Sequence, residues 1–244
     1  MTQNTISAQV SLFSYPQGGA LLDQTLADRL PNAQPVSIQA IFDELTYGEQ
    51  AQKVGQGGRQ AAWFITTSFG DVVLRQYRRG GLMAKVTDRL YFWAGAERTR
   101  SWREFQIMEY LYEQDVAVPK VLGAYWWRHG LCYTAALITA RIPGAKPLAS
   151  DLSDVYLQPV AIEIARMHQL GVWHADLNAY NILLDDGMAA WLIDFDRAQQ
   201  VPLTSRLIQQ NLLRLRRSLV KLHGQAGEHW WQKFYLIYSS LMQS

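Results

Sequence analysis

The sequence predicts an α+β protein, with an antiparallel sheet in the first part of its 244 residues and mainly helices in the last part. Residues 36–77 are rich in β-branched and aromatic side chains and are interrupted by glycine, a pattern typical of strands. Residues 98–114 have apolar side chains at helical spacing. Beyond residue 156, amphipathic helical segments flank one short hairpin, so strands and helices are largely segregated along the chain.

The composition is that of a folded globular protein. Hydrophobic residues make up 49% and charged residues 18% of the chain, which argues against disorder. The net charge of +2 does not indicate a nucleic-acid partner, and a single cysteine excludes an intrachain disulfide. The N-terminus lacks the pattern of a signal peptide, and the longest uncharged apolar run, LCYTAALITA, is too short to span a bilayer. We therefore expect neither a signal peptide nor a transmembrane helix.

The elements of the first part follow from short patterns. The runs AAWFITT and DVVLRQY are separated by SFG, which predicts a hairpin within a mostly antiparallel strand region over residues 36–77. The segment RTRSWREFQIMEYLYEQ predicts one amphipathic helix, and residues 116–142 predict two or three further strands, broken at Pro119 and at His129-Gly130. The apolar residues of the helix recur every three positions, at Trp102, Phe105, Met108 and Leu111.

The last part predicts three helices and one hairpin. QPVAIEIARMHQLG predicts a helix that stops at Gly171, and NILLDDGMAAWLIDF predicts two strands around the turn Asp185-Asp186-Gly187. LTSRLIQQNLLRLRRSLVKLHG and EHWWQKFYLIYSSLM predict two further helices. The change from strands to helices places a boundary near residues 139–144.

Polar residues cluster at both ends of the predicted hairpin. Asp176 and Asn181 precede its first strand, and Asp194 ends its second, so the hairpin brings the three residues together. One carboxylate can accept a proton from a hydroxyl, and an amide with another carboxylate suits Mg²⁺, which binds few protein groups plus phosphate. A base beside a Mg–phosphate site is what phosphoryl transfer needs. The alternative interpretation is that these residues only form turns.

These residues resemble two motifs of the protein-kinase-like superfamily. HADLNAYN resembles the catalytic loop His-x-Asp-Leu-x-x-x-Asn, and IDFD resembles the Asp-Phe-Gly metal motif with Asp196 in place of glycine. The resemblance implies a two-lobed kinase-like fold that uses ATP and Mg²⁺. It assigns the catalytic base to Asp176 and the metal ligands to Asn181 and Asp194. His174 is expected to brace the loop.

Further motifs lie upstream. VVLR resembles Val-Ala-Ile-Lys of the third kinase strand with Arg75 in place of lysine, and Glu104 matches the αC glutamate that would hold it. GQGGRQ resembles a degenerate glycine-rich loop whose backbone N–H groups approach ATP phosphates. The alternatives are a solvated helix residue at Glu104 and a simple turn at the glycines. The residues that the resemblance assigns to nucleotide binding are Gly55, Gly57, Gly58, Arg75 and Glu104.

The predicted organisation is a single kinase-like domain over residues 1–244. Its N-lobe, residues 1–139, would contain the nucleotide-binding antiparallel sheet and one αC-type helix. Its C-lobe, residues 140–244, would be mainly helical and contain the catalytic hairpin, the metal motif and the C-terminal helices. No Ala-Pro-Glu segment follows Asp196, and Asn178 replaces the lysine that protein kinases often have two residues after the base. Both departures argue against a protein substrate.

Most of the chain, from about Arg75 to Ala198, resembles the 3-deoxy-D-manno-octulosonic acid (Kdo) kinases of Gram-negative bacteria, in the lipopolysaccharide kinase family. The matching segments include LRQYRRGGLMAKVTDRLYFW, ERTRSWREF, AVPKVLGAYWWRHGLCYTAALITARIPGA and GVWHADLNAYNILLD. The resemblance implies ATP-dependent phosphorylation of the Kdo 4-hydroxyl on Kdo-lipid A precursor, during lipopolysaccharide core biosynthesis. It also implies a peripheral position on the cytoplasmic face of the inner membrane.

Two basic segments could meet such an acceptor or an anionic membrane surface. The first interleaves basic with aromatic residues, and it could contact anionic lipid or bind the carboxylate and phosphates of the acceptor. The second is a basic helix, and for both the alternative is a solvated charged face. The first segment contains Arg75, Arg78, Arg79, Lys85, Arg89, Tyr91, Phe92, Trp93, Arg98 and Arg100; the second contains Arg206, Arg214, Arg216, Arg217 and Lys221.

Two other functions remain open from the sequence. A small-molecule kinase of the aminoglycoside or choline type has a similar catalytic loop but needs an acidic pocket for a cationic acceptor. A non-catalytic pseudokinase would bind ATP or lipid without turnover, and the departures at Arg75 and Asp196 keep this alternative open. Mg-dependent consumption of ATP separates the enzymes from the binding module.

Overall fold

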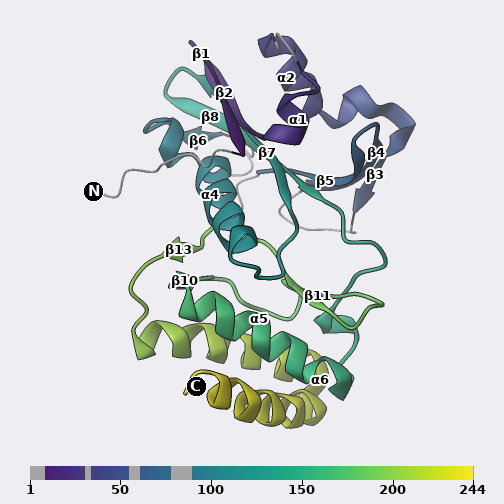
Figure 1. The fold of residues 1–244 in the computed structure, drawn as a ribbon, viewed down its shortest axis with the longest axis vertical. Helices are drawn as coiled ribbons and strands as arrows, with labels where there is room; N and C mark the ends of the chain where they lie inside the picture. The colour runs from purple at the N-terminus through teal and green to yellow at the C-terminus, as the bar shows by residue number, and fades with distance from the viewer. Residues whose placement is uncertain (1–8, 31–33, 55–60, 78–89, 244) are drawn as a thin grey trace. The chain divides into compact units, whose positions relative to one another are not determined.

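The computed structural model describes residues 9–30, 34–54, 61–77 and 90–243 (Figure 1). The chain forms two compact units. Unit 1 contains the residues up to Gln106 together with Lys120–Arg141, and unit 2 contains Ile107–Pro119 and Ile142–Ser244. The predicted combination of an antiparallel sheet with several helices is confirmed. The limits predicted for the two lobes and their kinase-like arrangement stay predictions.

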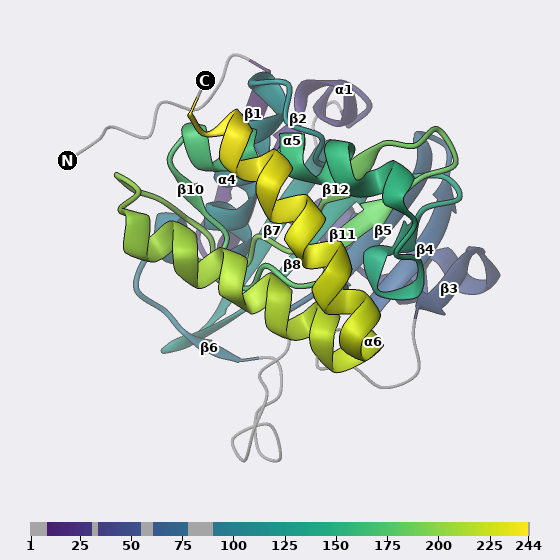
Figure 2. The same cartoon turned by 90° about the horizontal axis from the view of Figure 1, so that it is seen from below.

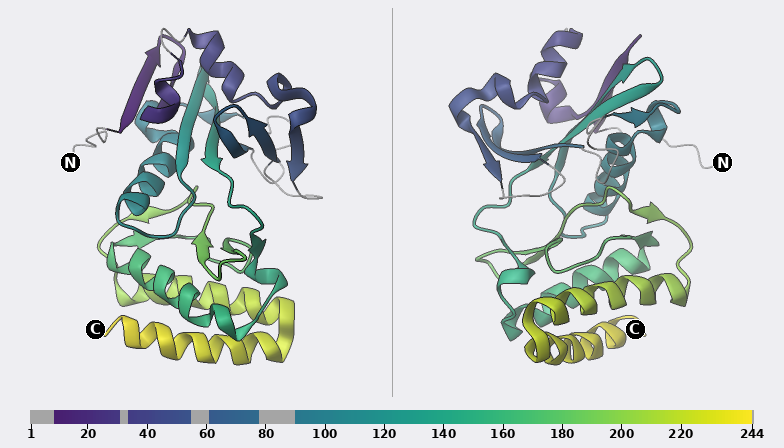
Figure 3. Two further views of the ribbon diagram at one scale, coloured as in Figure 1. Left: turned by 45° about the vertical axis from the view of Figure 1, so that its right-hand side comes forward. Right: turned by 180° about the vertical axis from the view of Figure 1, so that it is seen from behind.

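The described part of unit 1 contains an eight-stranded antiparallel sheet with the order β1-β2-β7-β8-β5-β4-β3, and β6 pairs with β8 (Figure 1 and Figure 3). The predicted hairpins β4–β5 and β7–β8 are both present. The strands are β1 (Val10–Tyr15), β2 (Gly18–Asp23), β3 (Ala51–Val54), β4 (Ala61–Thr67), β5 (Gly70–Gln76), β6 (Tyr91–Phe92), β7 (Val121–His129) and β8 (Cys132–Ala140).

The prediction of strands over residues 36–77 is wrong for its first part. Helix α2 (Pro35–Ile41) and the 3-10 segment η1 (Glu44–Gln50) precede the strands there. Pro35 stands in the first turn of α2, where its fixed φ favours the helix and its missing N–H has no consequence. Ile38 and Phe42, four residues apart, are both buried, so packing outweighs local strand propensity.

Helices cover both faces of the sheet in unit 1. On one face, Ile38 and Phe42 pack into a core with Leu74 of β5, joined by residues of the short helix α1 (Gln24–Ala27). On the other face lies α4 (Arg100–Glu113), the predicted amphipathic helix, whose first half belongs to unit 1. Its Trp102 ring meets Trp126 of β7 edge-on, with the ring centroids 5.2 Å apart.

Unit 2 is built on two helices and short strand pairs. Helix α5 (Leu157–Gln169) ends as predicted before Gly171, whose φ of 76° breaks the helix. The predicted hairpin is β11 with β12, and its turn includes Asp185. The strands are β9 (Lys146–Pro147), β10 (Val172–Trp173), β11 (Ile182–Leu184), β12 (Ala190–Leu192) and β13 (Gln199–Gln200); the 3-10 segments are η2 (Ala96–Arg98) in unit 1 and η3 (Leu148–Ser150) and η4 (Asp154–Tyr156) in unit 2.

The two predicted C-terminal helices are the two arms of α6 (Ser205–Leu241), which reverses direction at Gly224 (Figure 2). Gly224 has φ 57° and ψ −128°, a combination that glycine adopts readily and other residues do not. At Gly227, an added Cβ would lie 2.3 Å from the Leu219 carbonyl oxygen, so glycine also permits the close approach of the arms. No helix in the described residues is both long enough and apolar enough to cross a bilayer.

Candidate active site

The predicted catalytic loop joins β10 to β11 in unit 2 and is held by its own hydrogen bonds. The Asp176 N–H donates to the His174 carbonyl oxygen (2.7 Å), and the Asn181 N–H donates to the Asn178 carbonyl oxygen (3.0 Å). Asn178 Nδ2 also donates to the Asp176 carbonyl oxygen (2.9 Å). Asn178, which stands where protein kinases often have lysine, therefore stabilises the turn that presents Asp176.

The hairpin connects Asn181 with the residue before Asp194. Ile182 pairs with Leu192 in the β11–β12 ladder, and the Ile193 N–H donates to the Asn181 carbonyl oxygen (3.0 Å). The Asn181 side chain is buried, and its Nδ2 donates to the Asp176 carbonyl oxygen (2.9 Å). A continuous set of backbone and side-chain contacts thus links the segments that contain Asp176, Asn181 and Asp194.

His174 braces this cluster. Its side chain is fully buried, and its Nε2 lies 2.9 Å from the Ile193 carbonyl oxygen, to which it donates as a neutral ring. Burial lowers the pKa of His174, although the Ile193 carbonyl and the charge of Asp194 act in the opposite direction. His174 therefore joins the start of the catalytic loop to the residue before Asp194 as a structural group.

Two non-glycine residues of the cluster have left-handed backbones. Ala175, immediately before Asp176, has φ 61°, and Asp194 has φ 66°. This conformation disfavours residues with a side chain, although aspartate tolerates it better than most. Residues in such conformations gather at functional sites, where the surrounding structure enforces them. The catalytic loop, at Ala175, and the end of the hairpin, at Asp194, therefore both contain such a left-handed residue.

The first arm of α6 supports the loop from one side. Asn211 Oδ1 accepts from the His174 backbone N–H (3.2 Å), and Ser218 Oγ accepts from the Ala179 N–H (3.2 Å). Asn211 and Ser218 are seven residues apart, about two helical turns, so both lie on one side of the helix. Neither residue could be selected from the sequence, because each contacts a loop more than 35 positions away.

Arg214 lies on the same side of α6 and pairs with Asp176. Its Nε is 2.6 Å and its Nη2 is 2.5 Å from Asp176 Oδ1. Asn178 Nδ2 is 3.4 Å from the same oxygen, whereas Oδ2 forms no hydrogen bond with any residue that the structure describes. Sequence reasoning placed Arg214 only among the cations of a basic helix. Spacing relative to Asn211 and Ser218 could have indicated its side of the helix, but not its partner.

Buried polar groups lie beneath the loop. His168 of α5 has Nε2 3.1 Å from Asn211 Oδ1 and Nδ1 2.8 Å from the Tyr238 hydroxyl. Because Oδ1 accepts hydrogen bonds only, Nε2 donates and the neutral ring can accept from Tyr238 at Nδ1. Burial lowers the pKa of His168 to about 4, against a smaller raising effect of the Asn211 hydrogen bond. The neutral state of His168 is therefore part of the folded structure.

The donor set at the hairpin end fits Mg²⁺. With Nδ2 of Asn181 turned to the Asp176 carbonyl, the amide oxygen is the atom left to bind a cation, and Asp194 follows Ile193, whose N–H donates to the Asn181 carbonyl. An amide oxygen and a carboxylate are hard ligands, and Mg²⁺ usually takes the rest of its octahedron from water and phosphate. Within the described ranges, no group of three or more His, Cys, Asp and Glu residues could hold a metal ion.

Unit 1 contains the predicted arginine–glutamate pair. Arg75 of β5 forms an ion pair with Glu104 Oε1 on α4, and the hydroxyl of Tyr77 donates to Glu104 Oε2. The Arg75 guanidinium also lies 5.4 Å from the centroid of the Tyr77 ring. Tyr77 directly follows the end of β5 and lies two positions after Arg75, and side chains two positions apart in an extended chain share a face, which explains why both reach α4. Tyr77 was not selected from the sequence, although its spacing of two from Arg75 indicated the shared face.

Two other predicted features fall wholly or partly outside the described residues. Gly55, Gly57 and Gly58 all lie there. So do Arg78, Arg79, Lys85 and Arg89 of the basic–aromatic segment. In its second half, Arg100 Nη1 donates to the Tyr91 hydroxyl (2.8 Å), and its guanidinium lies 4.9 Å from the Tyr91 ring centroid. Arg100 therefore has a structural role in unit 1.

Known proteins resemble the chain over most of its length. Residues 46–238 match the model of the Lipopolysaccharide kinase (Kdo/WaaP) family. Curated relatives named 3-deoxy-D-manno-octulosonic acid kinase include one from Xylella fastidiosa (strain M23), 44% identical over 190 residues and 76% of each chain. Another, from Stenotrophomonas maltophilia (strain R551-3), is 46% identical over 202 residues and 80% of each chain. A third, from Xanthomonas campestris pv. campestris (strain B100), is 46% identical over 190 residues, 75% of this chain and 76% of the relative. The chain belongs to the lipopolysaccharide kinase (Kdo/WaaP) family.

Proposed function

We propose that the protein is a Kdo kinase, which transfers the γ-phosphate of ATP to a hydroxyl of Kdo on Kdo-lipid A precursor in lipopolysaccharide biosynthesis. By family resemblance the acceptor is the 4-hydroxyl. Family membership and the names of the relatives support the reaction class and the sugar. The observation that best supports catalysis by this chain is the hydrogen-bonded cluster that joins the segments of Asp176, Asn181 and Asp194.

Asp176 acts as the base in this proposal. The acceptor oxygen forms a bond to the γ-phosphorus as the bond from that phosphorus to the ADP oxygen breaks, and the hydroxyl proton passes to Asp176. Since Arg214 and Asn178 already contact Oδ1, we assign the proton to Oδ2. A positioned base of this kind contributes about 10²- to 10⁴-fold to the rate.

The kinase motifs also assign residues to ATP and its metal ion in this proposal. Asn181 and Asp194 would hold Mg²⁺, which when bound neutralises charge on the phosphates. Arg75, fixed by Glu104, would contact the α- and β-phosphates as a planar fork. The backbone N–H groups of the segment that contains Gly55, Gly57 and Gly58 would contact the phosphates as well.

We place the reaction on the cytoplasmic face of the inner membrane, with the protein attached peripherally. ATP is supplied on that side, and the acceptor is a lipid. Basic residues near an anionic surface contribute about 1 kcal/mol each to such attachment. Sedimentation with anionic vesicles, measured at rising salt, tests this placement, because electrostatic binding weakens as salt screens it.

The direct test of the proposed function is an acceptor panel. The protein is incubated with labelled ATP and Mg²⁺ together with Kdo-lipid A precursor, an aminoglycoside, choline or casein. Transfer of label to the Kdo lipid alone is expected. Transfer only to the aminoglycoside or to choline would replace the proposal with a small-molecule kinase, and ATP binding without turnover on any acceptor would indicate a pseudokinase.

A further inference from the structure

Arg214 has donors that its pair with Asp176 does not use. A guanidinium has five N–H groups, and Arg214 directs Nε and Nη2 at the single oxygen Oδ1. Its Nη1 forms no hydrogen bond with a residue in the described part of the chain. Its side chain is 47% exposed, so a ligand can reach the remaining N–H groups. An anion bound there would lie beside the proposed base.

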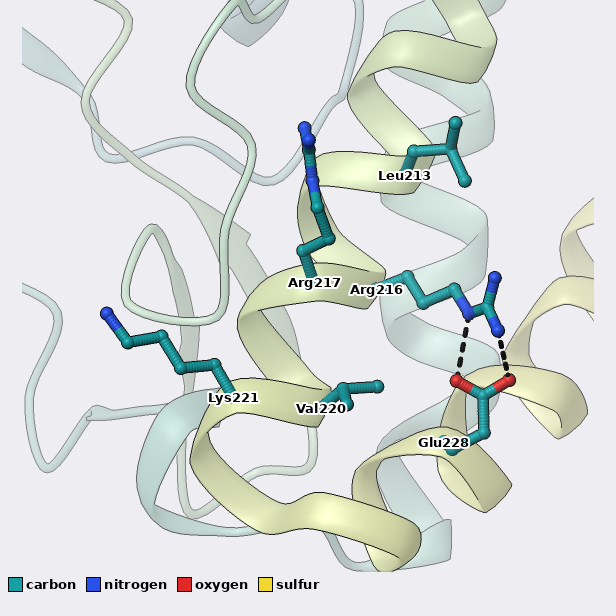
Figure 4. A pocket seen from close by; sticks show the side chains of 6 residues that line it. All are labelled: Leu213, Arg216, Arg217, Val220, Lys221 and Glu228. Carbon is teal, nitrogen blue, oxygen red and sulfur yellow. Dashed lines mark hydrogen bonds and ion pairs between the residues drawn. The ribbon is translucent and has the colours of Figure 1, made fainter.

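Arg214 begins a row of cations on the first arm of α6. Arg217 and Lys221 follow it at positions i+3 and i+7, which share one side of a helix. Figure 4 shows Arg217 and Lys221 extending from one side of the arm, whereas Arg216 extends from the other. Both Arg217 and Lys221 are exposed, and neither forms an ion pair with any residue that the structure describes.

The neighbouring Arg216 shows the contrast. It forms two parallel hydrogen bonds of 2.8 Å to the carboxylate of Glu228 on the second arm, as Figure 4 shows. This bidentate pair joins the two arms and neutralises Arg216. Arg216 therefore has a structural partner, while Arg217, the next residue along, has none among the described residues. Adjacent arginines with the same chemistry thus differ in whether they are available to a ligand.

We propose that Arg214, Arg217 and Lys221 form the binding site for the anionic groups of the acceptor. Arg214 binds the carboxylate of the sugar acid with its unused N–H groups, and Arg217 with Lys221 binds the phosphates of the lipid part. The arginine fork matches a carboxylate or phosphate edge, and lysine serves as a point charge. This inference rests on the proposed Kdo kinase function and names the residues that would select its acceptor.

The size and lining of the site fit this occupant. Arg214 and Lys221 are seven residues apart, which is roughly 10 Å along the helix, so the row can meet separate anionic groups of one extended molecule. A surface pocket of about 520 Å³ is lined by Leu213, Arg216, Arg217, Val220, Lys221 and Glu228 (Figure 4). Because Arg216 and Glu228 neutralise each other, the cations that this lining leaves for an anion are Arg217 and Lys221. A mixed basic and apolar lining suits an anionic lipid-linked sugar.

The row also starts at the proposed base, and this favours the acceptor over a membrane surface as its occupant. A cation that serves only to bind anionic phospholipid has no need to contact Asp176. A cation that orients the acceptor needs to lie beside Asp176, because the reacting hydroxyl and the acceptor's anion must both be placed near the base.

The test compares three variants with the wild type on three acceptors. The variants are Arg214→Gln, the double variant Arg217→Gln/Lys221→Gln, and Arg206→Gln as a control, since Arg206 is an exposed cation on the same arm that does not line the pocket. The acceptors are Kdo-lipid A precursor, the same lipid with its Kdo carboxylate converted to an amide, and the same lipid without phosphates. Phosphate transfer gives kcat and KM, and acceptor binding without ATP gives Kd.

Arg214→Gln is expected to raise KM and Kd for the complete acceptor by about 10- to 100-fold, the loss expected for a charge-assisted contact. Against the amide acceptor, the same change should have little effect. The double variant should raise KM with kcat unchanged, and this effect should disappear with the phosphate-free lipid. Arg206→Gln should leave KM and Kd unchanged for every acceptor.

Two results would overturn the inference. An equal effect of Arg214→Gln on the carboxylate and amide acceptors would show that Arg214 only positions Asp176. A loss of binding to acceptor-free anionic vesicles by the double variant, with unchanged KM in detergent, would assign Arg217 and Lys221 to the membrane. If Arg214→Gln does not fold, Arg214→Lys replaces it, with a smaller rise in KM expected. A wild type that transfers no phosphate to Kdo lipid would contradict the proposed function itself.

Discussion

The two units each contain an arginine paired with a proposed functional carboxylate, but in different surroundings. In unit 1, Arg75 is 14% exposed and Glu104 is fully buried, and Tyr77 donates to the same carboxylate. In unit 2, Arg214 and Asp176 are 47% and 39% exposed. The first pair is enclosed by protein on most sides, whereas the second faces solvent and keeps an oxygen and several N–H groups available.

The difference in exposure indicates that the two arginine–carboxylate pairs have different roles. Removing one partner of a buried pair leaves a charge without compensation, so such a pair is a fixed part of the fold. An exposed pair contributes little to stability, because water and salt screen both charges. We therefore expect Glu104 to matter for folding and for the orientation of Arg75, and Arg214 to matter for the acceptor.

Glu104→Gln should produce the largest change in stability. It removes the carboxylate that pairs with the largely buried guanidinium of Arg75, and it disturbs the hydrogen bond from Tyr77. Breaking a buried pair in this way typically lowers the free energy of unfolding by about 3–5 kcal/mol. Urea unfolding of the variant and the wild type measures the difference.

The control for this variant removes both charges. Arg75→Met combined with Glu104→Gln should recover most of the lost free energy of unfolding, because both charges of the buried pair are then removed. Its kcat should stay low if Arg75 contacts ATP. A double variant as unstable as Glu104→Gln alone would show that the charge of Arg75 is not the cause.

Low pH should destabilise the protein through buried His168, which contacts Asn211 on the same helix as Arg214. The pKa of His168 is about 4 in the folded protein, below its ordinary value of 6.5, so the unfolded chain binds more protons between these values. The free energy of unfolding therefore falls as the pH is lowered through this window. Between pH 7 and pH 5 the loss from His168 is about 2 kcal/mol.

Urea unfolding at the two pH values measures this loss, and His168→Gln is its control. The variant lacks the titrating group beside Asn211, so its stability should depend less on pH than that of the wild type. His174, whose pKa burial also lowers, keeps part of the dependence in the variant. If the free energy of unfolding changes equally with pH in both proteins, the lowered pKa of His168 is not the cause of the pH dependence.

Arg214→Gln should change stability least. The pair with Asp176 is about half exposed, so its loss should lower the free energy of unfolding by less than about 1 kcal/mol. Thermal or urea unfolding checks this, alongside the acceptor measurements above. A loss as large as that of Glu104→Gln would remove the distinction between the enclosed and the open pair.

Local patterns were sufficient for much of the fold and for the core of the candidate site. The hairpin was predictable because a Gly-containing turn separates two short apolar runs, and the ladder then makes Asn181 and Ile193 neighbours. The pair of Arg75 with Glu104 was predictable because each matches a motif position. Helix α4 followed from its apolar spacing. The catalytic and ligand-binding roles of these residues stay predictions.

Other features depended on contacts that no local pattern specifies. Arg214 is one of several cations on its helix, and only the packing of α6 against the loop selects it for Asp176. The hairpin of β1 with β2 was not predicted, because β2 is buried on both faces and so lacks the alternation that indicates a strand. Helix α2 was mistaken for strand, because burial of Ile38 and Phe42 outweighed local propensity.

The central claim is that Asp176 is the base of a Kdo kinase, and one comparison of kcat tests it most directly. Asp176→Asn keeps the shape of the side chain but removes its ability to accept a proton, so kcat on Kdo-lipid A precursor should fall by about 10²- to 10⁴-fold. Asp186→Asn, an exposed carboxylate in the turn of the same hairpin, should leave kcat unchanged. Near-wild-type kcat in Asp176→Asn, with the fold intact, would contradict the account.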